Sequence, residues 1–442
     1  MLLMKFGGTS VGDAERIRNV FEIVSAAKSR RPVVVASAHK GVTDLLFEAA
    51  RAAATGTVKA NRIRETHQRI LADLGLDVGL LDKLLTEVEV LLKGISLVRE
   101  LTPRTLDYVA SFGERMSSRT VAEYFNRQGY PAVAVDAFDL GLLTDSNFGN
   151  ASPLPEADAL MAENIKRYDR LPIVTGYIGK DKNGDITTLG RNGSDYSASI
   201  VGAAIGAEEI QIWTDVDGVM TADPRLVKDA KSIDVMSFNE ASELAYYGGK
   251  VLHPYTLIPA VRKGIPVRVL NTFKPSAKGT VILQQAEISG VVKSIAYKRN
   301  LYLINIISTR MLYRSGFMSQ IFETFGKHQI VIDMIASSEV SVSLTTDSDR
   351  NLEPAMKELA QFAEVTVEPE KAIVCVVGEG MRSASGIERD VFDAMKRAGI
   401  NVQMISQGAT RINLAFLIDN PEVPSAVAAL HDMFFGNGRK RA

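Results

Sequence analysis

Short apolar, β-branched runs alternate with longer amphipathic stretches between Met1 and about Leu283. The short runs, which we expect to form strands, are residues 2–6, 33–37, 132–136, 173–175, 210–214 and 267–270. Alternation of this kind is typical of folds in which helices cover both faces of a parallel sheet. The pattern therefore predicts an α/β domain with a mostly parallel central sheet.

Residues from about 44 to 129 follow another pattern, because amphipathic stretches succeed one another there without a strand between them. Thr102 and Pro103 predict the N-cap and first turn of a helix, and Gly129 predicts a helix end. We expect a helical subdomain beside the sheet.

The alternation of short apolar runs and amphipathic stretches changes after the polar, turn-rich residues 273–280. We therefore expect a domain boundary near residues 284–290, with the first domain spanning residues 1–284. Residues 291–368 form the first of two similar units. Its order is a strand at 301–308, a helix at 317–328, strands at 331–337 and 340–345, a helix at 352–362 and a strand at 364–367. This order is βαββαβ, as in ferredoxin-like folds.

Residues 369–442 form the second unit, with a strand at 372–377, a helix at 387–398, strands at 401–406 and 412–418, and a helix at 423–435. Its final strand is missing, which would leave an edge of a four-stranded sheet unpaired. We therefore expect residues 291–297 to supply that strand, so that the first unit is inserted within the second.

Composition narrows the choice of protein class. A chain of 442 residues exceeds what one hydrophobic core usually serves. The net charge is −1 and the longest basic run is the end of the chain, so nucleic acid is not an expected partner. Cys375, the single cysteine, lies in an apolar run and is expected to be buried. No signal peptide or bilayer-length apolar run is present, which favours a cytoplasmic protein without a membrane partner.

The segment from Lys5 to Ser10 reads Lys-Phe-Gly-Gly-Thr-Ser and joins the first strand to a helix that begins near Asp13. Glycines let a backbone approach an anion, while a helix N-terminus and a lysine supply positive charge. The order differs from a P-loop, whose lysine follows the glycines, and from the dinucleotide-binding G-x-G-x-x-G pattern. The segment predicts a phosphate site, with an ordinary tight turn as the alternative.

A second glycine-broken loop covers residues 188–198 and leads into a helix of small residues. Ser194 or Asp195 would cap that helix, and a simple capping turn is the alternative to a functional role. Arg191 and Asp195 place a cation and an acid beside this second helix N-terminus. Two such termini facing each other would enclose a triphosphate and its metal.

Residues 213–225 follow the strand at 210–214, and ligands of open α/β sheets bind beyond the carboxyl ends of strands. Asp215 and Asp217 invite a calcium-loop interpretation, which fails because the remaining ligand spacing and the closing glutamate are absent. A nucleotide-facing loop with Arg225 available to phosphate fits better.

Two further residues stand beside glycines. Glu114 follows Gly113 at what we expect to be a break between two helices, where solvated surface charge is the default for a glutamate. Lys250 follows a glycine pair at 248–249 and is a candidate nucleotide contact.

These clusters, in order and spacing, resemble the aspartate kinases of the amino-acid kinase superfamily. The resemblance rests on residues 5–10, 37–43, 111–115, 190–195, 213–225 and 248–254 and covers nearly the whole chain. It implies a three-layer amino-acid kinase sandwich, and the two C-terminal units resemble paired ACT domains. No homoserine dehydrogenase domain follows, so the monofunctional type is expected.

The resemblance also implies roles for individual residues. Those expected along ATP are Lys5, Gly7, Gly8 and Ser10 at the phosphates, then Thr214, Asp215, Arg225 and Lys250. Those expected to hold aspartate are Ser37, Thr43, Glu114 and Arg191, with Glu114 on the ammonium and Arg191 on the α-carboxylate. Asp195 would orient Lys5, and these two form the expected catalytic pair.

The chain departs from the family pattern at Asn192, where glycine is usual, and at His39, Lys40 and Asp44. Asn tolerates left-handed backbone angles, so we expect the loop to keep its shape. The implied reaction transfers phosphate from ATP to the β-carboxylate of L-aspartate, giving 4-phospho-L-aspartate, the first step of lysine, threonine and methionine biosynthesis. That carboxylate is ionised at neutral pH, so catalysis would consist of positioning and charge stabilisation by Lys5, helix N-termini and Mg²⁺.

The first C-terminal unit resembles the effector site of lysine-sensitive aspartate kinases. The residues implied are Met311, Ser315, Gly316, Phe317, Met318, Asp333 and Ser338, with Asp333 on the effector's ammonium. A hairpin surface with a helix cap is the alternative. Lysine is the first expected effector and threonine the second, and ACT pairing between subunits favours a homodimer or a dimer of dimers.

Two other functions compete with a feedback-regulated aspartate kinase. A related kinase for another acidic or carbamate substrate is opposed by the combination of Glu114, Arg191 and the ACT pair. A non-catalytic amino-acid sensor is opposed by the presence of both Lys5 and Asp195.

Overall fold

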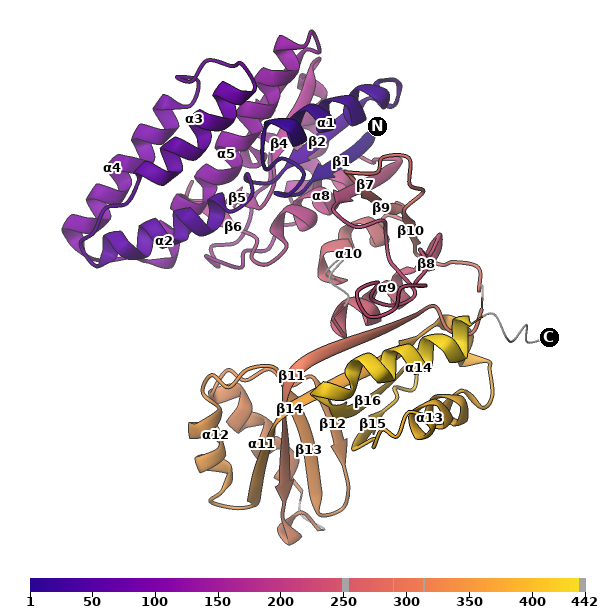
Figure 1. Ribbon diagram of the computed structural model, residues 1–442. Helices are drawn as coiled ribbons and strands as arrows, with labels where there is room; N and C mark the ends of the chain where they lie inside the picture. Colours follow the sequence, from indigo (N-terminus) through magenta and orange to yellow (C-terminus); the bar gives the residue numbers. More distant parts are fainter. Residues whose placement is uncertain (249–253, 289, 313–314, 437–442) are drawn as a thin grey trace. The chain divides into compact units, whose positions relative to one another are not determined.

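The computed structural model describes residues 1–248, 254–288, 290–312 and 315–436. The chain forms two compact units (Figure 1). The first comprises residues 1–219, 234–238 and the described part of 251–286. The second comprises residues 220–233, the described part of 239–250, and the described residues after 286.

Residues 220–233 and the described part of 239–250 thus belong to the second unit, although they precede the boundary that the sequence predicts near residues 284–290. Residues 220–233 belong to the second unit because they bury apolar side chains in its core, where Ala222 and Val227 pack with Val292 and Ile295. The sequence pattern did not reveal this, because Ala222 and Val227 lie in a loop without periodicity.

The first unit is built on an eight-stranded sheet in the order β3-β4-β2-β1-β7-β9-β10-β8. Neighbouring strands are parallel except β9 and β10, which confirms the predicted mostly parallel sheet. The strands are β1 (Leu2–Phe6), β2 (Pro32–Ala36), β3 (Ala132–Val135), β4 (Leu171–Thr175), β7 (Glu209–Thr214), β8 (Val235–Ser237), β9 (Val267–Asn271) and β10 (Thr280–Leu283). A separate hairpin pairs β5 (Ile178–Lys180) with β6 (Ile186–Thr188).

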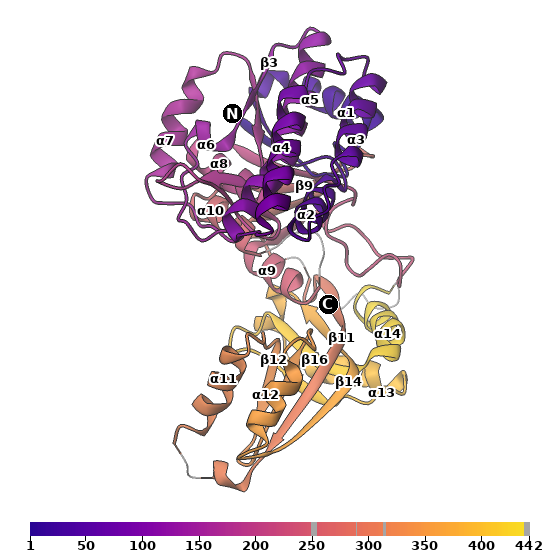
Figure 2. The same ribbon diagram turned by 90° about the vertical axis from the view of Figure 1, so that its left-hand side faces the viewer.

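Helices lie on both sides of this sheet (Figure 2). On one side are α1 (Ala14–Ala26), α2 (Val42–Ala54), α3 (Asn61–Asp73), α4 (Asp82–Val98) and α5 (Pro103–Arg127). On the other are α6 (Ala137–Leu140), α7 (Ala157–Asn164), α8 (Gly193–Ala204) and α10 (Pro254–Arg262). Short 3₁₀ helices cover Lys28–Arg30 and Ile165–Arg167.

The alternation of β1 decides which way Lys5 faces. Leu2, Met4 and Phe6 join the core formed with α1–α5. Because successive side chains of a strand point to opposite faces, Leu3 and Lys5 face the other side. Leu3 there lies close to Gly202 of α8. Lys5 is therefore directed toward the α8 side of the sheet.

Helix α5 begins and ends as predicted, with Thr102 as N-cap, Pro103 in the first turn, and Gly129 at φ 80° just beyond its end. The predicted break at Gly113 is wrong, because the helix continues through this residue. A β-carbon on Gly113 would lie 2.8 Å from the Ala38 side chain, so the glycine serves close packing. Glu114 is therefore buried within a helix and does not lie at its end.

The second unit contains a six-stranded antiparallel sheet in the order β12-β13-β11-β14-β16-β15. Its strands are β11 (Ser294–Ile307), β12 (Met334–Ser337), β13 (Ser341–Thr346), β14 (Glu364–Val377), β15 (Met404–Ser406) and β16 (Asn413–Asp419). Its helices are α9 (Phe238–Tyr246), whose residues after Phe238 belong here, α11 (Phe317–Lys327), α12 (Leu352–Leu359), α13 (Ile387–Arg397) and α14 (Val423–Phe435). Short 3₁₀ helices cover Thr309–Met311, Glu379–Arg382 and Asn420–Glu422.

The two C-terminal βαββαβ patterns share the long strands β11 and β14. Residues 294–301 of β11 pair with the second half of β14, next to β16, and residues 303–307 pair with its first half. The strand missing from the second pattern thus comes from the chain ahead of the first. The strands expected at 364–367 and 372–377 are one continuous strand, β14, whose register with β11 shifts between Lys298 and Leu301 and again between Leu301 and Leu303.

Each pattern has its own core. Ile304, Ile321 and Phe325 are among the buried residues of one, and Val374, Val391 and Phe416 are among those of the other. Cys375 is fully buried, as predicted. None of the helices in the described part of the chain combines the length and the apolar character that spanning a bilayer requires.

Candidate active site

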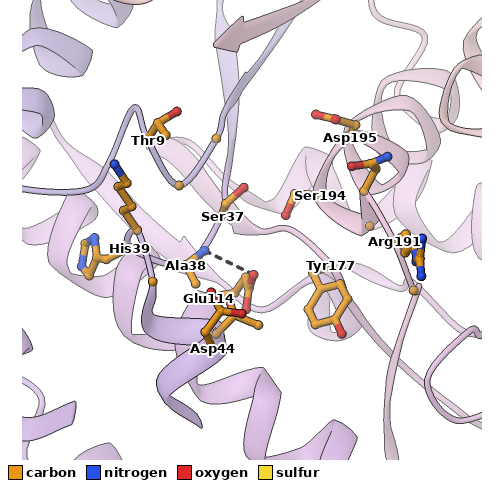
Figure 3. Close-up of a pocket in the computed structure, with 18 of the residues that line it drawn as sticks. Thr9, Ser37, Ala38, His39, Asp44, Glu114, Tyr177, Arg191, Ser194 and Asp195 are labelled. Carbon is orange, nitrogen blue, oxygen red and sulfur yellow. Dashed lines mark hydrogen bonds between the residues drawn. The ribbon is translucent and has the colours of Figure 1, made fainter. Parts of the chain in front are cut away.

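A cavity of about 630 Å³ opens in the first unit beyond the carboxyl ends of β1 and β2 (Figure 3). Its walls are residues 7–9 after β1, residues 37–41, 43 and 44 after β2, and the turn of residues 190–195 at the start of α8. Lys5, Phe47, Glu114 of α5, Gly149 and Tyr177 also line it. This is the position in which open α/β sheets bind their ligands.

Lys5 and Asp195 meet in this cavity. The Lys5 Nζ lies 2.5 Å from Asp195 Oδ1, and the two side chains are only 10% and 14% exposed. Lys5 comes from β1 and faces the α8 side, while Asp195 lies in the first turn of α8. Two segments far apart in the sequence therefore place a cation and an acid in contact, as the sequence predicts.

The glycine pair after β1 makes this contact possible. A β-carbon on Gly7 would lie 3.3 Å from Lys5 Nζ, and one on Gly8 would lie 2.9 Å from the Ala38 carbonyl oxygen. Thr9 lines the cavity, but Ser10 is fully buried. The Ser10 hydroxyl is 2.7 Å from the Thr272 hydroxyl, so it holds the loop against the turn that follows β9.

The helix N-termini at the cavity are not the pair that the sequence suggests. Asp13 caps α1 by accepting a hydrogen bond from the Arg16 amide, and no described residue of α1 lines the cavity. The walls instead include the starts of α2 and α8, whose N-caps are Gly41 and Asn192.

Asn192 adopts a left-handed φ of 54°, so the expectation that the loop accepts asparagine is confirmed. The prediction that Ser194 or Asp195 caps α8 is wrong, since Asn192 is the N-cap and the helix begins at Gly193. Asp195, placed in the first turn, is thereby directed toward Lys5.

Glu114 is 3% exposed, which contradicts the surface-charge default. Its Oε1 accepts a hydrogen bond of 3.2 Å from the Ala38 amide, and its buried Oε2 has no partner among the described residues. Burial raises the pKa of Glu114 to about 8. A carboxyl group in this state is suited to a ligand that brings its own positive charge.

The other residues expected around aspartate, Ser37, Thr43 and Arg191, also line the cavity. Those expected along the nucleotide are more dispersed. Thr214 and Asp215 lie at the end of β7, outside this cavity, with the Thr214 hydroxyl 3.3 Å from the Asp215 carboxylate. Arg225 lies in the second unit, 2.6 Å from Asp223, and Lys250 is outside the described residues. Their contacts with a nucleotide stay predictions.

Two cavity residues have no signal in the sequence. Tyr177 has a left-handed φ of 65°, although it is not a glycine, and its ring lines the cavity. His39 is buried, and its Nδ1 lies 2.5 Å from the Val11 carbonyl oxygen. Burial, reinforced by nearby His67, lowers the pKa of His39 to about 3, so its ring is neutral and Nδ1–H is the donor. His39 thus ties the loop after β2 to the loop after β1.

The expected effector residues lie around the start of α11 and on the neighbouring strands. Met311 ends a 3₁₀ helix, and the exposed Ser315 precedes Gly316, the N-cap of α11. Phe317 is buried, and Met318 packs against the same core. Ser338 shares a 2.7 Å hydrogen bond with Ser341. Asp333 Oδ1 accepts a hydrogen bond of 2.7 Å from Lys298 Nζ. The buried Asp333 Oδ2 has no partner among the described residues.

Comparison with known proteins gives a consistent result along the whole chain. The amino acid kinase family model matches residues 1–271, and the ACT domain model matches residues 304–361 and 374–434. Aspartokinase 2, chloroplastic, of Arabidopsis thaliana is 40% identical over 98% of this chain and 84% of its own. Lysine-sensitive aspartokinase 3 of Escherichia coli (strain K12) is 35% identical over 98% of this chain and 99% of its own.

Two solved structures of aspartokinase III from Escherichia coli have the same fold at 34% identity. The complex with aspartate and ADP, in the R-state, has a TM-score of 0.84 and covers 98% of this chain and 100% of that one. The complex with lysine and aspartate, in the T-state, has a TM-score of 0.83 and covers 98% of this chain and 99% of that one. The chain therefore belongs to the aspartokinases, with an amino acid kinase fold followed by ACT domains.

Proposed function

We propose that this protein transfers the γ-phosphoryl group of ATP to the β-carboxylate of L-aspartate and is inhibited by lysine. The observation that carries the proposal is the contact of Lys5 with Asp195 in a cavity that also holds Glu114 Oε2, for which the described part of the chain offers no partner. The product would be 4-phospho-L-aspartate, which opens the route to lysine, threonine and methionine.

The aspartate end of the cavity follows from charge. Glu114 would pair its Oε2 with the substrate ammonium, giving up its proton as it does so, and Arg191 would hold the α-carboxylate in a bidentate contact. Ser37 and Thr43 line the same wall and would donate hydroxyl hydrogen bonds. These contacts leave the β-carboxylate directed toward Lys5.

The transfer itself requires no general base, since an aspartate side chain with a pKa of about 3.9 is ionised at neutral pH. The barrier to overcome is repulsion between this carboxylate and the triphosphate. Lys5, held in place by Asp195, and the N-termini of α2 and α8 would stabilise the charge on the moving phosphoryl group. Gly7 and Gly8 would let the phosphates approach the backbone.

Mg²⁺ fits this site as an ion carried by the nucleotide. Among the described residues, no group of three or more His, Cys, Asp or Glu side chains forms a metal site of its own. Kinases bind Mg²⁺ chiefly through the phosphate oxygens of the nucleotide and through water, with one or two carboxylates of the protein. Asp195 and Asp44 are the aspartates that line the cavity. The ion would neutralise charge on the phosphates.

Regulation by lysine would use the second unit. The Asp333 Oδ2 is buried and has no partner among the residues that the structure describes, as expected of a group that receives an effector's ammonium. The loop before α11 would hold the effector's carboxylate. We assign catalysis to residues 1–284 and regulation to the ACT units at 291–368 and 369–442, in a cytoplasmic homodimer or dimer of dimers.

The test is ADP release from ATP with aspartate, glutamate or acetylglutamate as acceptor, each with and without millimolar lysine. We expect release with aspartate and its suppression by lysine. Equal release with all three acceptors would refute the substrate assignment, and rates unchanged by lysine would refute the regulatory one.

A further inference from the structure

Tyr177 combines a disfavoured backbone conformation with a place in the cavity wall. Its φ is 65°, in the left-handed region of backbone conformation that residues other than glycine, asparagine and aspartate seldom adopt. Residues held in such conformations cluster at ligand sites, where the surrounding structure keeps them in place. The observed angle therefore raises the question of what this ring does.

The surroundings of Tyr177 fix it from both sides. Its amide donates a hydrogen bond of 2.9 Å to the Ser197 hydroxyl, and its carbonyl accepts one of 2.9 Å from the Leu189 amide. The ring lies directly against the turn that carries Arg191, because a β-carbon on Gly193 would lie 2.5 Å from Tyr177 Cδ2. The ring is therefore a rigid part of the wall.

The ring also stands at the end of the cavity proposed for aspartate. Figure 3 draws Tyr177 between Glu114 and Arg191, the residues that would hold the two ends of the amino-acid group. Burial is the main cause that raises the pKa of Tyr177 to about 12, although the hydrogen bond of its hydroxyl with the Thr188 side chain acts in the opposite direction. The hydroxyl is therefore protonated, and the ring meets a substrate as a neutral, mostly apolar surface.

We propose that the Tyr177 ring sets the length of the acidic substrate that the cavity accepts. With the ammonium at Glu114 and the α-carboxylate at Arg191, the ring blocks retreat of the substrate away from Lys5. Aspartate then fits, whereas glutamate has one methylene too many between its fixed end and the phosphoryl group. This inference rests on the proposed aspartate kinase activity.

The experiment measures the ratio of kcat/KM for aspartate to that for glutamate in three variants. Tyr177→Phe keeps the ring and should leave the ratio within about twofold of the wild-type value. Tyr177→Gly removes the ring at a position whose φ suits glycine, and should lower the ratio by about 10-fold or more, since one methylene in a tight pocket is worth about 10–200-fold. Phe47→Ala enlarges the same cavity from α2 and should keep the wild-type ratio.

The alternatives are separable. No aspartate turnover in the wild-type protein refutes the proposed activity itself. Wild-type turnover with an unchanged ratio in Tyr177→Gly, or an equal loss of discrimination in Phe47→Ala, refutes only the role of Tyr177. If thermal denaturation shows that Tyr177→Gly is unfolded, Tyr177→Asn provides the same test, because asparagine also tolerates this φ. For a variant too slow to assay, the ratio of the Kd values for the two amino acids by calorimetry replaces the kinetic one.

Discussion

At the scale of single residues, the site is organised by charged groups that the fold buries before any ligand is present. Glu114 lies in the middle of α5, where one oxygen accepts a hydrogen bond from Ala38 and the other finds no partner in the described part of the chain. Leaving a buried polar group unpaired lowers stability and is unusual in native proteins. A function that supplies the missing partner explains why the residue is present.

Glu114→Gln should therefore raise the stability of the protein and lower its activity. The pKa of Glu114 in the folded protein, about 8, exceeds the ordinary value of 4.5 for a glutamate side chain. The folded state thus keeps a proton that the unfolded chain has released, and stability falls as the pH rises between these two values. Glutamine avoids this fall, so the variant should have the higher Tm at about pH 8.

The same variant should lose about 10²-fold in kcat/KM for aspartate, because it cannot pair with the substrate ammonium. In the wild-type protein, KM for aspartate should decrease from about pH 7 to about pH 9 as Glu114 ionises. A wild-type pH profile in the variant would contradict the role given to Glu114.

Lys5→Ala should reduce kcat by about 10²-fold or more, which is the loss expected when one preorganised charge is removed from a phosphoryl-transfer site. Lys83→Ala removes an equal charge from the exposed side of α4 and provides the control. Steady-state turnover of the two purified variants is the measurement. Wild-type turnover in Lys5→Ala would show that the phosphate site is misassigned.

At the scale of the elements, much of the architecture could be predicted because local signals were strong. The strand at residues 2–6, the start of α5 at Thr102 and its end before Gly129 were recognised from apolar runs, a capping residue and a glycine. The helix break expected at Gly113 is absent, because the sequence does not distinguish a glycine needed for close packing from a glycine that ends a helix. Only the contact with Ala38, distant in sequence, distinguishes them.

Gly113→Ala should therefore destabilise the protein by about 1–3 kcal/mol through overpacking against Ala38, and should weaken aspartate binding because Glu114 follows directly. Gly94→Ala in α4 is a matched control, since nothing lies within 4 Å of the added carbon. It should stabilise by about 0.5–1 kcal/mol through helix propensity. Urea denaturation of both variants checks the opposite signs, and equal effects would contradict the packing argument.

At the scale of the whole molecule, the sequence indicated which segments carry the chemistry but not every contact among them. The convergence of Lys5 and Asp195 was predictable from two glycine-rich turns, one after β1 and the other at the start of α8. The positions of Tyr177 and His39 were not, because a left-handed tyrosine and a buried histidine have no local pattern. The entry of residues 220–233 into the second unit was also missed, because it depends on tertiary burial alone.

Asp333→Asn tests the regulatory role proposed for the second unit. The variant should keep uninhibited turnover but require about 10-fold or more lysine for half-inhibition, because a charge-assisted contact to the effector ammonium is lost. Asp349→Asn, in an exposed loop of the same unit, should retain normal sensitivity. Unaltered inhibition of Asp333→Asn would place the effector elsewhere.

The central claim is that Lys5 and Asp195 together prepare the site for phosphoryl transfer to the aspartate side chain. Trapping the acyl phosphate with hydroxylamine tests this directly, because the hydroxamate forms only when a carboxylate has been phosphorylated. We predict hydroxamate from the wild-type protein with ATP and aspartate together, and almost none from Lys5→Ala. ATP consumption by the wild-type protein without any hydroxamate would contradict the account.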